Sequence, residues 1–232
     1  MSDTPILTLK DVRYRWPGRA GFGLAVPDFT LQAGETVLLL GESGSGKSTL
    51  LSLICGTITA QSGKVAVAGT DLASLSAAAR DRFRAEQIGV IFQQFNLLPF
   101  GRVLENILLP LRFAKNRRKR VSDPNTAATT LCQALGLPDD VLNLRAGTLS
   151  VGQQQRVAAA RALIGQPPLI IADEPTSALD AATQTTFLDL LFAQSRANGT
   201  ALLMVSHDAR LAPHFDRVVE MNEIAQIQRE PA

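Results

Sequence analysis

The stretch "GESGSGKST", from Gly41 to Thr49, constrains the fold of this chain more than any other. It follows the apolar run "TVLLL" and precedes "LLSLICG", which predicts a strand, a glycine-rich turn and a helix in succession. Glycines let consecutive backbone amides face inward around phosphates, while Lys47 can reach the β- and γ-phosphates and Ser48 can ligate Mg²⁺. The stretch therefore predicts a nucleotide-phosphate site formed by Gly41, Glu42, Ser43, Gly44, Ser45, Gly46, Lys47, Ser48 and Thr49.

Two kinds of strand pattern predict the fold class. The runs "ETVLLLG" and "PPLIIADEP" are short, continuously apolar and bounded by turn residues, as expected for strands buried on both faces. Helical patterns such as "STLLSLICG", "NTAATTLCQALG" and "ATQTTFLDLLFAQSRANG" alternate with such runs, which predicts an α/β fold with a parallel sheet and crossover helices. The early stretches "ILTLKDVRYRW" and "FGLAVPDFTLQAG" alternate apolar with polar residues and predict antiparallel strands.

A length of 232 residues fits one α/β domain carrying a smaller subdomain better than two full domains. From about 95 to 165 the buried-strand pattern gives way to helices and loops, so we expect an inserted helical subdomain there. Residues 1–94 and 166–232 are then predicted to form the α/β core, which includes the antiparallel strands. After His207, "RVVEM" and "IAQIQ" predict a hairpin around Asn222-Glu223, and we expect no further regulatory domain.

Composition excludes several function classes. A net charge of +2, from 23 basic and 21 acidic residues, is too balanced to indicate a nucleic-acid binder. Cys55 and Cys132 lie in no CxxC motif, so neither a disulfide framework nor a zinc site is expected, as fits a reducing cytoplasm. The first residues lack a signal-peptide pattern and the longest apolar runs are too short for a bilayer, so membrane contact is expected only through a partner.

The basic run "RRKR", from Arg117 to Arg120, has two readings. A solvated loop is the one we favour, because a charge run is usually an exposed surface. Binding of anionic lipid headgroups is the alternative.

Two adjacent carboxylates follow the buried run "LIIA". Asp173 ends the strand, where it can face the phosphate loop and hold Mg²⁺. Glu174 can then lie at the γ-phosphate and polarise a water molecule as a general base. Taken alone, Glu174 is also compatible with a solvated strand end.

The stretch "LSVGQQQR" places Ser150 three residues before Gln153, which matches a capping box at a helix start. A helix cap is the structural interpretation of these residues. Because a helix N-terminus offers free amides and a partial positive charge, phosphate recognition is compatible with the same cap.

The motifs "GESGSGKST", "LSVGQQQR", "IIADEP", "SALD" and "VSHD", in this order, resemble those of ABC-type ATPase subunits. The resemblance implies the P-loop ABC ATPase fold, hydrolysis of ATP with Mg²⁺, and a head-to-tail homodimer. In such a dimer each ATP lies between the P-loop of one copy and the signature of the other. The resemblance therefore implies that Ser150 meets the γ-phosphate of the ATP bound by the other copy, and that Gly152 and Gln153 also bind this nucleotide.

The same resemblance implies roles for three further residues. Gln93 of "IFQQ" links the metal and the attacking water to the helical subdomain, with Gln94 as the weaker candidate. His207 of "VSHD" contacts the γ-phosphate and Glu174, and Asp180 of "SALD" crosses the dimer interface. On local sequence alone, His207 could be a structural histidine and Asp180 a helix cap.

Two details concern the nucleotide base and the signature. An adenine ring needs an aromatic face, and the alignment of "VRYRWPG" favours Trp16 over Tyr14 for that role. Val151 stands where the family usually has glycine, and its Cβ can hinder backbone approach to a phosphate. Because Ser150 and Gly152 remain, we expect ATPase activity to be weakened at most.

Near Gln93, "FNLLP" followed by "ENILLPL" resembles the branch of lipoprotein-releasing, macrolide-exporting, haem-exporting and cell-division subunits. Members pair with a separate integral membrane permease, which implies a peripheral location on the cytoplasmic face of the inner or plasma membrane. Four apolar residues suit the docking groove for such a permease, or equally the subdomain core: Phe95, Leu97, Leu98 and Phe100.

Two other functions stay open. A soluble ABC ATPase of DNA repair or translation usually carries a coiled-coil insertion or a second ATPase domain, and this sequence has neither. A nucleotide-binding regulator without turnover is disfavoured by four residues that serve hydrolysis: Lys47, Asp173, Glu174 and His207.

Overall fold

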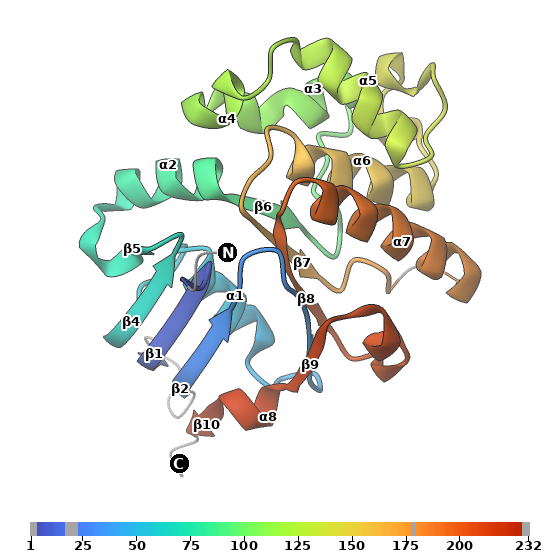
Figure 1. The fold of residues 1–232 in the computed structure, drawn as a ribbon. Coiled ribbons are helices and arrows are strands. Elements are labelled where there is room, and N and C mark those ends of the chain that lie inside the picture. The colour runs from blue at the N-terminus through green and yellow to red at the C-terminus, as the bar shows by residue number, and fades with distance from the viewer. Residues whose placement is uncertain (1–3, 17–22, 178–179, 229–232) are drawn as a thin grey trace.

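Two five-stranded sheets organise the computed structural model, which describes residues 4–16, 23–177 and 180–228 (Figure 1). All strand pairs of the first sheet are parallel, in the order β6 (Ile88–Ile91), β7 (Leu169–Asp173), β8 (Ala201–Ser206), β3 (Thr36–Leu40) and β9 (Arg217–Glu220). The second is antiparallel, in the order β10 (Gln226–Gln228), β2 (Gly23–Leu31), β1 (Leu7–Arg15), β4 (Ser62–Val67) and β5 (Thr70–Asp71).

Helices alternate with the strands of the parallel sheet, as the sequence pattern predicts. They are α1 (Lys47–Ile54), α2 (Ala77–Gln87), α3 (Val103–Leu108), α4 (Lys115–Lys119), α5 (Pro124–Ala134), α6 (Val151–Leu163), α7 (Ala181–Ala197) and α8 (Met221–Ile224). Figure 1 shows α3, α4 and α5 gathered at one end of the molecule, with α6 between them and the parallel sheet. Within the described part of the chain, every helix is too short or too polar to span a bilayer.

The predicted α/β fold is confirmed, with its parallel sheet, its antiparallel N-terminal strands and its helical insertion. Helices α3 to α6 lie within the stretch 95–165 that the sequence assigns to a helical subdomain. The division of the chain at those two positions stays a prediction. Residues 62–91, which no sequence pattern assigned, add β4, β5, α2 and β6.

The parallel strands are apolar throughout because both of their faces are buried. In β3, Leu38 and Leu40 pack into the core that contains α3, α5, α6 and α7. The alternate residues Val37 and Leu39 pack into a second core with α1 and the antiparallel sheet. A strand that separates two cores needs apolar side chains at consecutive positions, which explains the run "TVLLL".

The hairpin expected near the C-terminal end is wrong. β9 pairs with β3 in parallel, while β10 pairs with β2 of the other sheet. Between them the buried side chains of Met221 and Ile224 anchor the single turn of α8. Glu223 accepts a hydrogen bond from the amide of Glu220, which caps that turn. Each strand therefore completes the edge of a different sheet, because both edges offer unpaired backbone groups.

The solvated-loop reading of "RRKR" is wrong for Arg117, which is 1% exposed. Its guanidinium donates to four backbone carbonyls of α2, β6 and the end of α6, those of Ala85, Ile88, Ala162 and Ile164. These carbonyls lie at element ends, where backbone partners are lacking, and the five N–H donors of arginine satisfy them. Burial lowers the pKa of Arg117 to about 10. The other three residues of the run are exposed, as expected.

Arg117→Met should destabilise the protein by about 3 kcal/mol or more, because it leaves several buried carbonyls without a donor. Urea unfolding measures the free energy of unfolding. The matched control Lys119→Met changes an exposed residue of the same helix and should alter stability by less than ~0.5 kcal/mol. Equal effects of the two substitutions would show that the buried contacts of Arg117 contribute nothing.

Candidate functional site

Four loops meet at one edge of the parallel sheet. The turn 41–46 follows β3, Gln93 follows β6, Asp173 and Glu174 lie at the end of β7, and His207 follows β8. Since β6, β7, β8 and β3 are neighbours and all run in the same direction, their carboxyl ends share that edge. Ligands of open α/β sheets bind at such an edge. The topology therefore brings together side chains that lie far apart in the sequence.

A cavity of about 940 Å³ opens between these loops. Most of the predicted phosphate-binding, metal-binding and catalytic residues line it together with Ser52, which sequence analysis did not single out. The lining residues are Trp16, Glu42, Ser43, Gly44, Gly46, Lys47, Ser48, Thr49, Ser52, Gln93, Asp173, Glu174 and His207.

The turn before α1 has the backbone that its glycines permit. Gly44 and Gly46 have φ of 81° and 94°, in the left-handed region that favours glycine. Gly46 caps α1 without a side-chain hydrogen bond, so the first amides of this helix remain free for an anion. Gly41 and Ser45 do not line the cavity but pack behind it, where a Cβ on Gly41 would lie 2.7 Å from Ser45 Oγ.

Lys47 places an ammonium group in the wall of the cavity. The side chain is 8% exposed, and Nζ donates to the carbonyls of Gly41 at 2.5 Å and Glu42 at 2.9 Å. The same nitrogen lies 3.7 Å from Glu174 Oε1. A buried cation at this position can attract a phosphate group while it offsets the nearby carboxylates.

The carboxylate pair lies opposite Lys47. Burial and the neighbouring charge of Glu174 raise the pKa of Asp173, while Lys47 lowers it in part. Glu174 has φ of 43°, an unfavourable backbone for a non-glycine residue, and its amide donates to the carbonyl of Val205. Its Oε2 lies 3.1 Å from Nδ1 of His207. Backbone and histidine thus orient the Glu174 carboxylate within the cavity.

The aromatic pair at the cavity differs in exposure. Trp16 lines the cavity, and its Nε1 donates to Thr49 Oγ1 at 3.1 Å. Tyr14 is buried behind it, with the two rings edge to face at a centroid distance of 5.3 Å. This placement favours Trp16 over Tyr14 as the base-stacking residue, a role that stays a prediction.

The donors at the cavity fit Mg²⁺. Ser48, Gln93 and Asp173, which the sequence assigns to the metal, all line the cavity and all offer oxygen. Mg²⁺ prefers oxygen ligands and is usually bound by one or two carboxylates together with phosphates. Residues 4–16, 23–177 and 180–228 contain no group of three or more His, Cys, Asp or Glu side chains suited to a metal. The three oxygen donors of Ser48, Gln93 and Asp173 fit Mg²⁺.

The signature residues lie outside this cavity. Ser150 Oγ accepts from the amide of Gln153, and Gln153 Oε1 accepts from the amide of Ser150, so the predicted capping box of α6 is confirmed. Val151 is 48% exposed, and a Cβ added at Gly152 would meet nothing within 4 Å. The cap thus presents an open backbone surface, and a phosphate role for Ser150, Gly152 and Gln153 stays a prediction.

Asp180 is also confirmed as a helix cap. It accepts from the amide of Thr183 at 3.0 Å at the start of α7, and this hydrogen bond lowers the pKa of its carboxyl. The preceding residues 178 and 179 of "SALD" lie outside the described residues. The role of Asp180 across a dimer interface stays a prediction.

The buried face of α6 makes two contacts that were not predicted from the sequence. Gln155 Nε2 donates to the carbonyl of Pro175, next to Glu174, at 2.8 Å. Arg161 donates to the carbonyls of Phe95 and Asn96, just after Gln93. A signal was available, because both are polar residues within the otherwise apolar helix face of "QQQRVAAARAL".

Comparisons with known proteins agree with this geometry. A family model described as ABC transporter matches residues 24–177. The uncharacterized ABC transporter ATP-binding protein YbbA of Escherichia coli K12 is 42% identical over 203 residues, which cover 88% of this chain and 87% of that protein. The dimeric ATP-binding cassette MJ0796, bound to ADP and Pi after hydrolysis, is 34% identical with a TM-score of 0.74 and coverage of 92% and 93%.

A further solved structure, cbiO1 from Clostridium perfringens, has a TM-score of 0.80 at 23% identity. The alignment covers 97% of this chain and 88% of cbiO1. At that identity the likeness supports the fold alone.

Asp173→Asn should raise the melting temperature of the nucleotide-free protein at neutral pH, because it removes a charge that burial and Glu174 disfavour. A gain on the order of 1 kcal/mol corresponds to ~2–4 °C. The folded-state pKa of Asp173 is raised, so the gain should shrink as the pH falls below that pKa and be lost once the pH is below the lower pKa of the unfolded chain. Calorimetry across pH measures this dependence.

Asp208→Asn is the matched control. Hydrogen bonds from Arg210 lower the pKa of Asp208 to about 2, so removing this charge should lower the melting temperature at neutral pH. A destabilising Asp173→Asn would contradict the stated electrostatics of the site.

Proposed function

The chain belongs to the ABC transporter family of ATP-binding proteins and is an ATPase, and from that premise we propose that two copies hydrolyse Mg-ATP at a shared interface to drive a membrane permease. The observation that carries the proposal is the one cavity that gathers Lys47, Asp173, Glu174 and His207. A nucleotide-binding regulator without turnover would not need a carboxylate oriented by a histidine beside a phosphate site.

In this proposal the nucleotide is bound by the turn 41–46 and the start of α1. Free backbone amides and Lys47 bind the phosphates, and Trp16 stacks on the adenine. Ser48, Gln93 and Asp173 would hold Mg²⁺. When bound, this metal neutralises charge on the β- and γ-phosphates.

Glu174 is the proposed general base. Its carboxylate accepts a proton from the attacking water, whose oxygen bonds to the γ-phosphorus as the bond to the β–γ bridging oxygen breaks. ADP and phosphate are the products. His207, at 3.1 Å from Glu174, is proposed to orient this carboxylate and to contact the γ-phosphate.

The signature is proposed to complete the site of a second copy. Ser150, Gly152 and Gln153 lie outside the cavity of their own chain, while the N-terminus of α6 is open to a partner. Asp180 is proposed to cross the same interface. The dimeric, ADP-bound and Pi-bound structure of MJ0796 supports this arrangement as that of a relative.

A groove away from the nucleotide cavity supports docking of a permease. The groove, of about 620 Å³, lies between α2 and the turn 109–113 and has mostly apolar walls. Phe92 and Phe113, 41% and 66% exposed, contribute to those walls. An amphipathic helix of the membrane subunit could bury its apolar face there.

The apolar cluster named from the sequence divides between core and surface. Phe95 is 7% exposed and Leu97 partly buried, and both pack in the helical core. Leu98 and Phe100 are 50% and 87% exposed. None of the four lines the groove.

The proposed location follows from the permease, since it would hold the chain at the cytoplasmic face of the inner or plasma membrane. The resemblance of "FNLLP" and "ENILLPL" supports export, extrusion or mechanical signalling as the coupled process. Such substrates include lipids, lipoproteins, peptides, haem and drug-like molecules. No nucleic-acid partner is proposed. A soluble ABC ATPase is the alternative, and it predicts that no permease co-purifies.

Glu174→Gln should lower kcat for ATP hydrolysis by about 10²- to 10⁴-fold, because the amide cannot accept the proton of the attacking water. ATP binding should persist, and ATP should trap a stable dimer. Phosphate release and mass photometry measure the two effects. Lys47→Ala is the contrasting variant, and it should weaken ATP binding itself. Near wild-type turnover by Glu174→Gln would remove Glu174 from its proposed role.

Phe113→Glu should impair permease docking while the chain stays folded, because it puts a charge on an exposed, apolar wall of the groove. The readout is co-purification of the permease, identified by mass spectrometry, together with basal ATPase. Leu144→Glu is the control, since Leu144 is 41% exposed and lies outside the groove. Unchanged permease recovery with Phe113→Glu would contradict docking at this groove.

A further inference from the structure

We propose that Arg161 is a positioning residue that fastens the loop after Gln93 to helix α6, so that the position of α6 sets the position of Gln93. This inference rests on the proposed role of Gln93 at the metal and the attacking water. It concerns hydrogen bonds from Arg161 to Asn96 and Phe95, which lie 65 and 66 residues before it in the chain.

The guanidinium of Arg161 bridges two consecutive backbone carbonyls. Nη1 donates to the carbonyl of Asn96 at 2.6 Å, and Nη2 donates to that of Phe95 at 2.5 Å. The side chain is 8% exposed, so water competes little for these hydrogen bonds. Arginine presents its donors in a planar fork, whereas a lysine ammonium cannot reproduce that paired geometry.

The bridged residues have a backbone that needs external support. Phe95 and Asn96 have φ of 58° and 48°, so two consecutive non-glycine residues occupy the left-handed region. Such conformations persist only where surrounding contacts impose them. The bonds from Arg161 supply such contacts directly after the turn that carries Gln93 and Gln94.

The remainder of the loop is fastened to the helical layer as well. Asn106 of α3 is fully buried, and it accepts from the amide of Leu98 at 2.7 Å while donating to the carbonyl of Leu98 at 3.1 Å. Residues 95–98 are thus held by α3 and α6, whereas Phe92–Gln94 form the link back to β6. A displacement of α6 is therefore transmitted to Gln93 through Arg161.

The two ends of α6 give this contact a functional meaning. Ser150, which caps the N-terminal end of the helix, is proposed to meet the γ-phosphate bound by a second copy, and Arg161 lies near the C-terminal end of the helix. Closure of the dimer would act on the first end, and Gln93 of the same chain would respond at the other. Gln155, between them, contacts the loop after Glu174.

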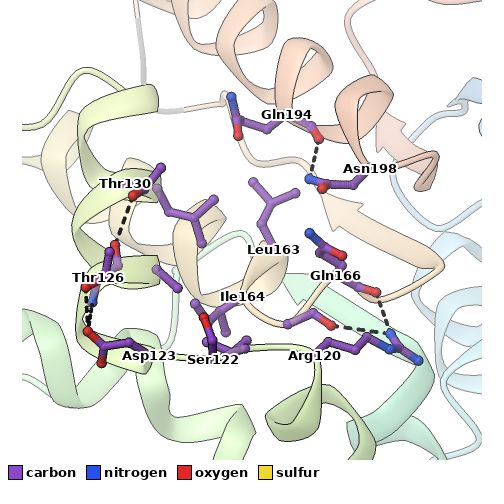
Figure 2. A pocket seen from close by; sticks show the side chains of 14 residues that line it. Arg120, Ser122, Asp123, Thr126, Thr130, Leu163, Ile164, Gln166, Gln194 and Asn198 are labelled. Carbon is purple, nitrogen blue, oxygen red and sulfur yellow. Dashed lines mark hydrogen bonds between the residues drawn. The ribbon is translucent and has the colours of Figure 1, made fainter.

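A second arginine, away from the nucleotide cavity, also donates to two consecutive backbone carbonyls. Arg120 donates to the consecutive carbonyls of Gly165 and Gln166 at 3.3 and 2.7 Å, as Figure 2 shows for the pocket beside α5 and α7. Gly165 and Gln166 have φ of 70° and 52°. Arg120 therefore also contacts a left-handed loop, but it does so through the single nitrogen Nη1 of an exposed side chain and without a link to Gln93.

The first measurement is amide hydrogen exchange of the full-length wild type and of Arg161→Lys. The substitution should accelerate exchange in residues 92–98 by tenfold or more and leave the first turns of α6 unchanged. Arg120→Lys, which changes an exposed contact made by one nitrogen, should leave exchange in residues 92–98 unchanged. Unchanged exchange in 92–98 of Arg161→Lys would overturn the proposal. If Arg161→Lys does not fold, Arg161→Gln, which keeps an amide donor without the buried charge, is measured in the same way.

The second measurement is a double-mutant cycle in ATPase assays. Arg161→Lys should lower kcat by tenfold or more with less than a twofold change in KM for ATP, and Arg120→Lys should change kcat by less than twofold. In the Gln93→Ala background, Arg161→Lys should add less than a further twofold loss. A merely structural role predicts that the two losses multiply, and that result would overturn the proposal.

The two proposals fail in different ways. Absence of ATP hydrolysis by the wild type would contradict the proposed function, while hydrogen exchange would still test the contact of Arg161. Normal wild-type hydrolysis with multiplicative losses in the cycle would contradict the positioning role alone.

Discussion

The geometry of the nucleotide site depends on the burial of β3 between two hydrophobic cores. Because its side chains alternate between those cores, a shift by one residue would exchange the two sets, so the strand has one register. In that register Leu40 pairs with Ser206 of β8, and the amide of Gly41 donates to the carbonyl of Ser206. The turn 41–46 and His207 therefore begin at the same level of the sheet. The pairing of β7 with β8 brings Asp173 to that level as well.

Several features of this site lower the stability of the folded protein but hold charged groups where ATP hydrolysis needs them. Two adjacent carboxylates lie at the end of a buried strand, and one has a raised pKa because of burial and its neighbour. Glu174 has a left-handed backbone, and Lys47 uses its ammonium protons on backbone carbonyls. Such departures from the local rules that favour folding are concentrated where an ATPase needs charge to be held in fixed positions.

The features that could be predicted from the sequence are those encoded by a few neighbouring residues. The turn before Lys47 and the cap at Ser150 are local patterns, so both could be read directly. The contacts of Arg117 and Arg161 join segments dozens of residues apart. An arginine in a helical sequence pattern does not reveal which backbone carbonyls its side chain will hydrogen-bond. The C-terminal strands were misassigned for the same reason, because β10 pairs with β2, a strand near the start of the sequence.

The central claim, that each ATP site is shared by two copies, is tested most directly by mixing two impaired variants. Ser150→Asp retains Glu174 but carries a charge that should repel the γ-phosphate of its partner, and Glu174→Gln retains Ser150 but lacks the base. In a mixed dimer one site combines Glu174 of the first variant with Ser150 of the second. The account predicts that phosphate release by the mixture clearly exceeds the sum of the separate variants. A mixture no more active than that sum would contradict a shared site.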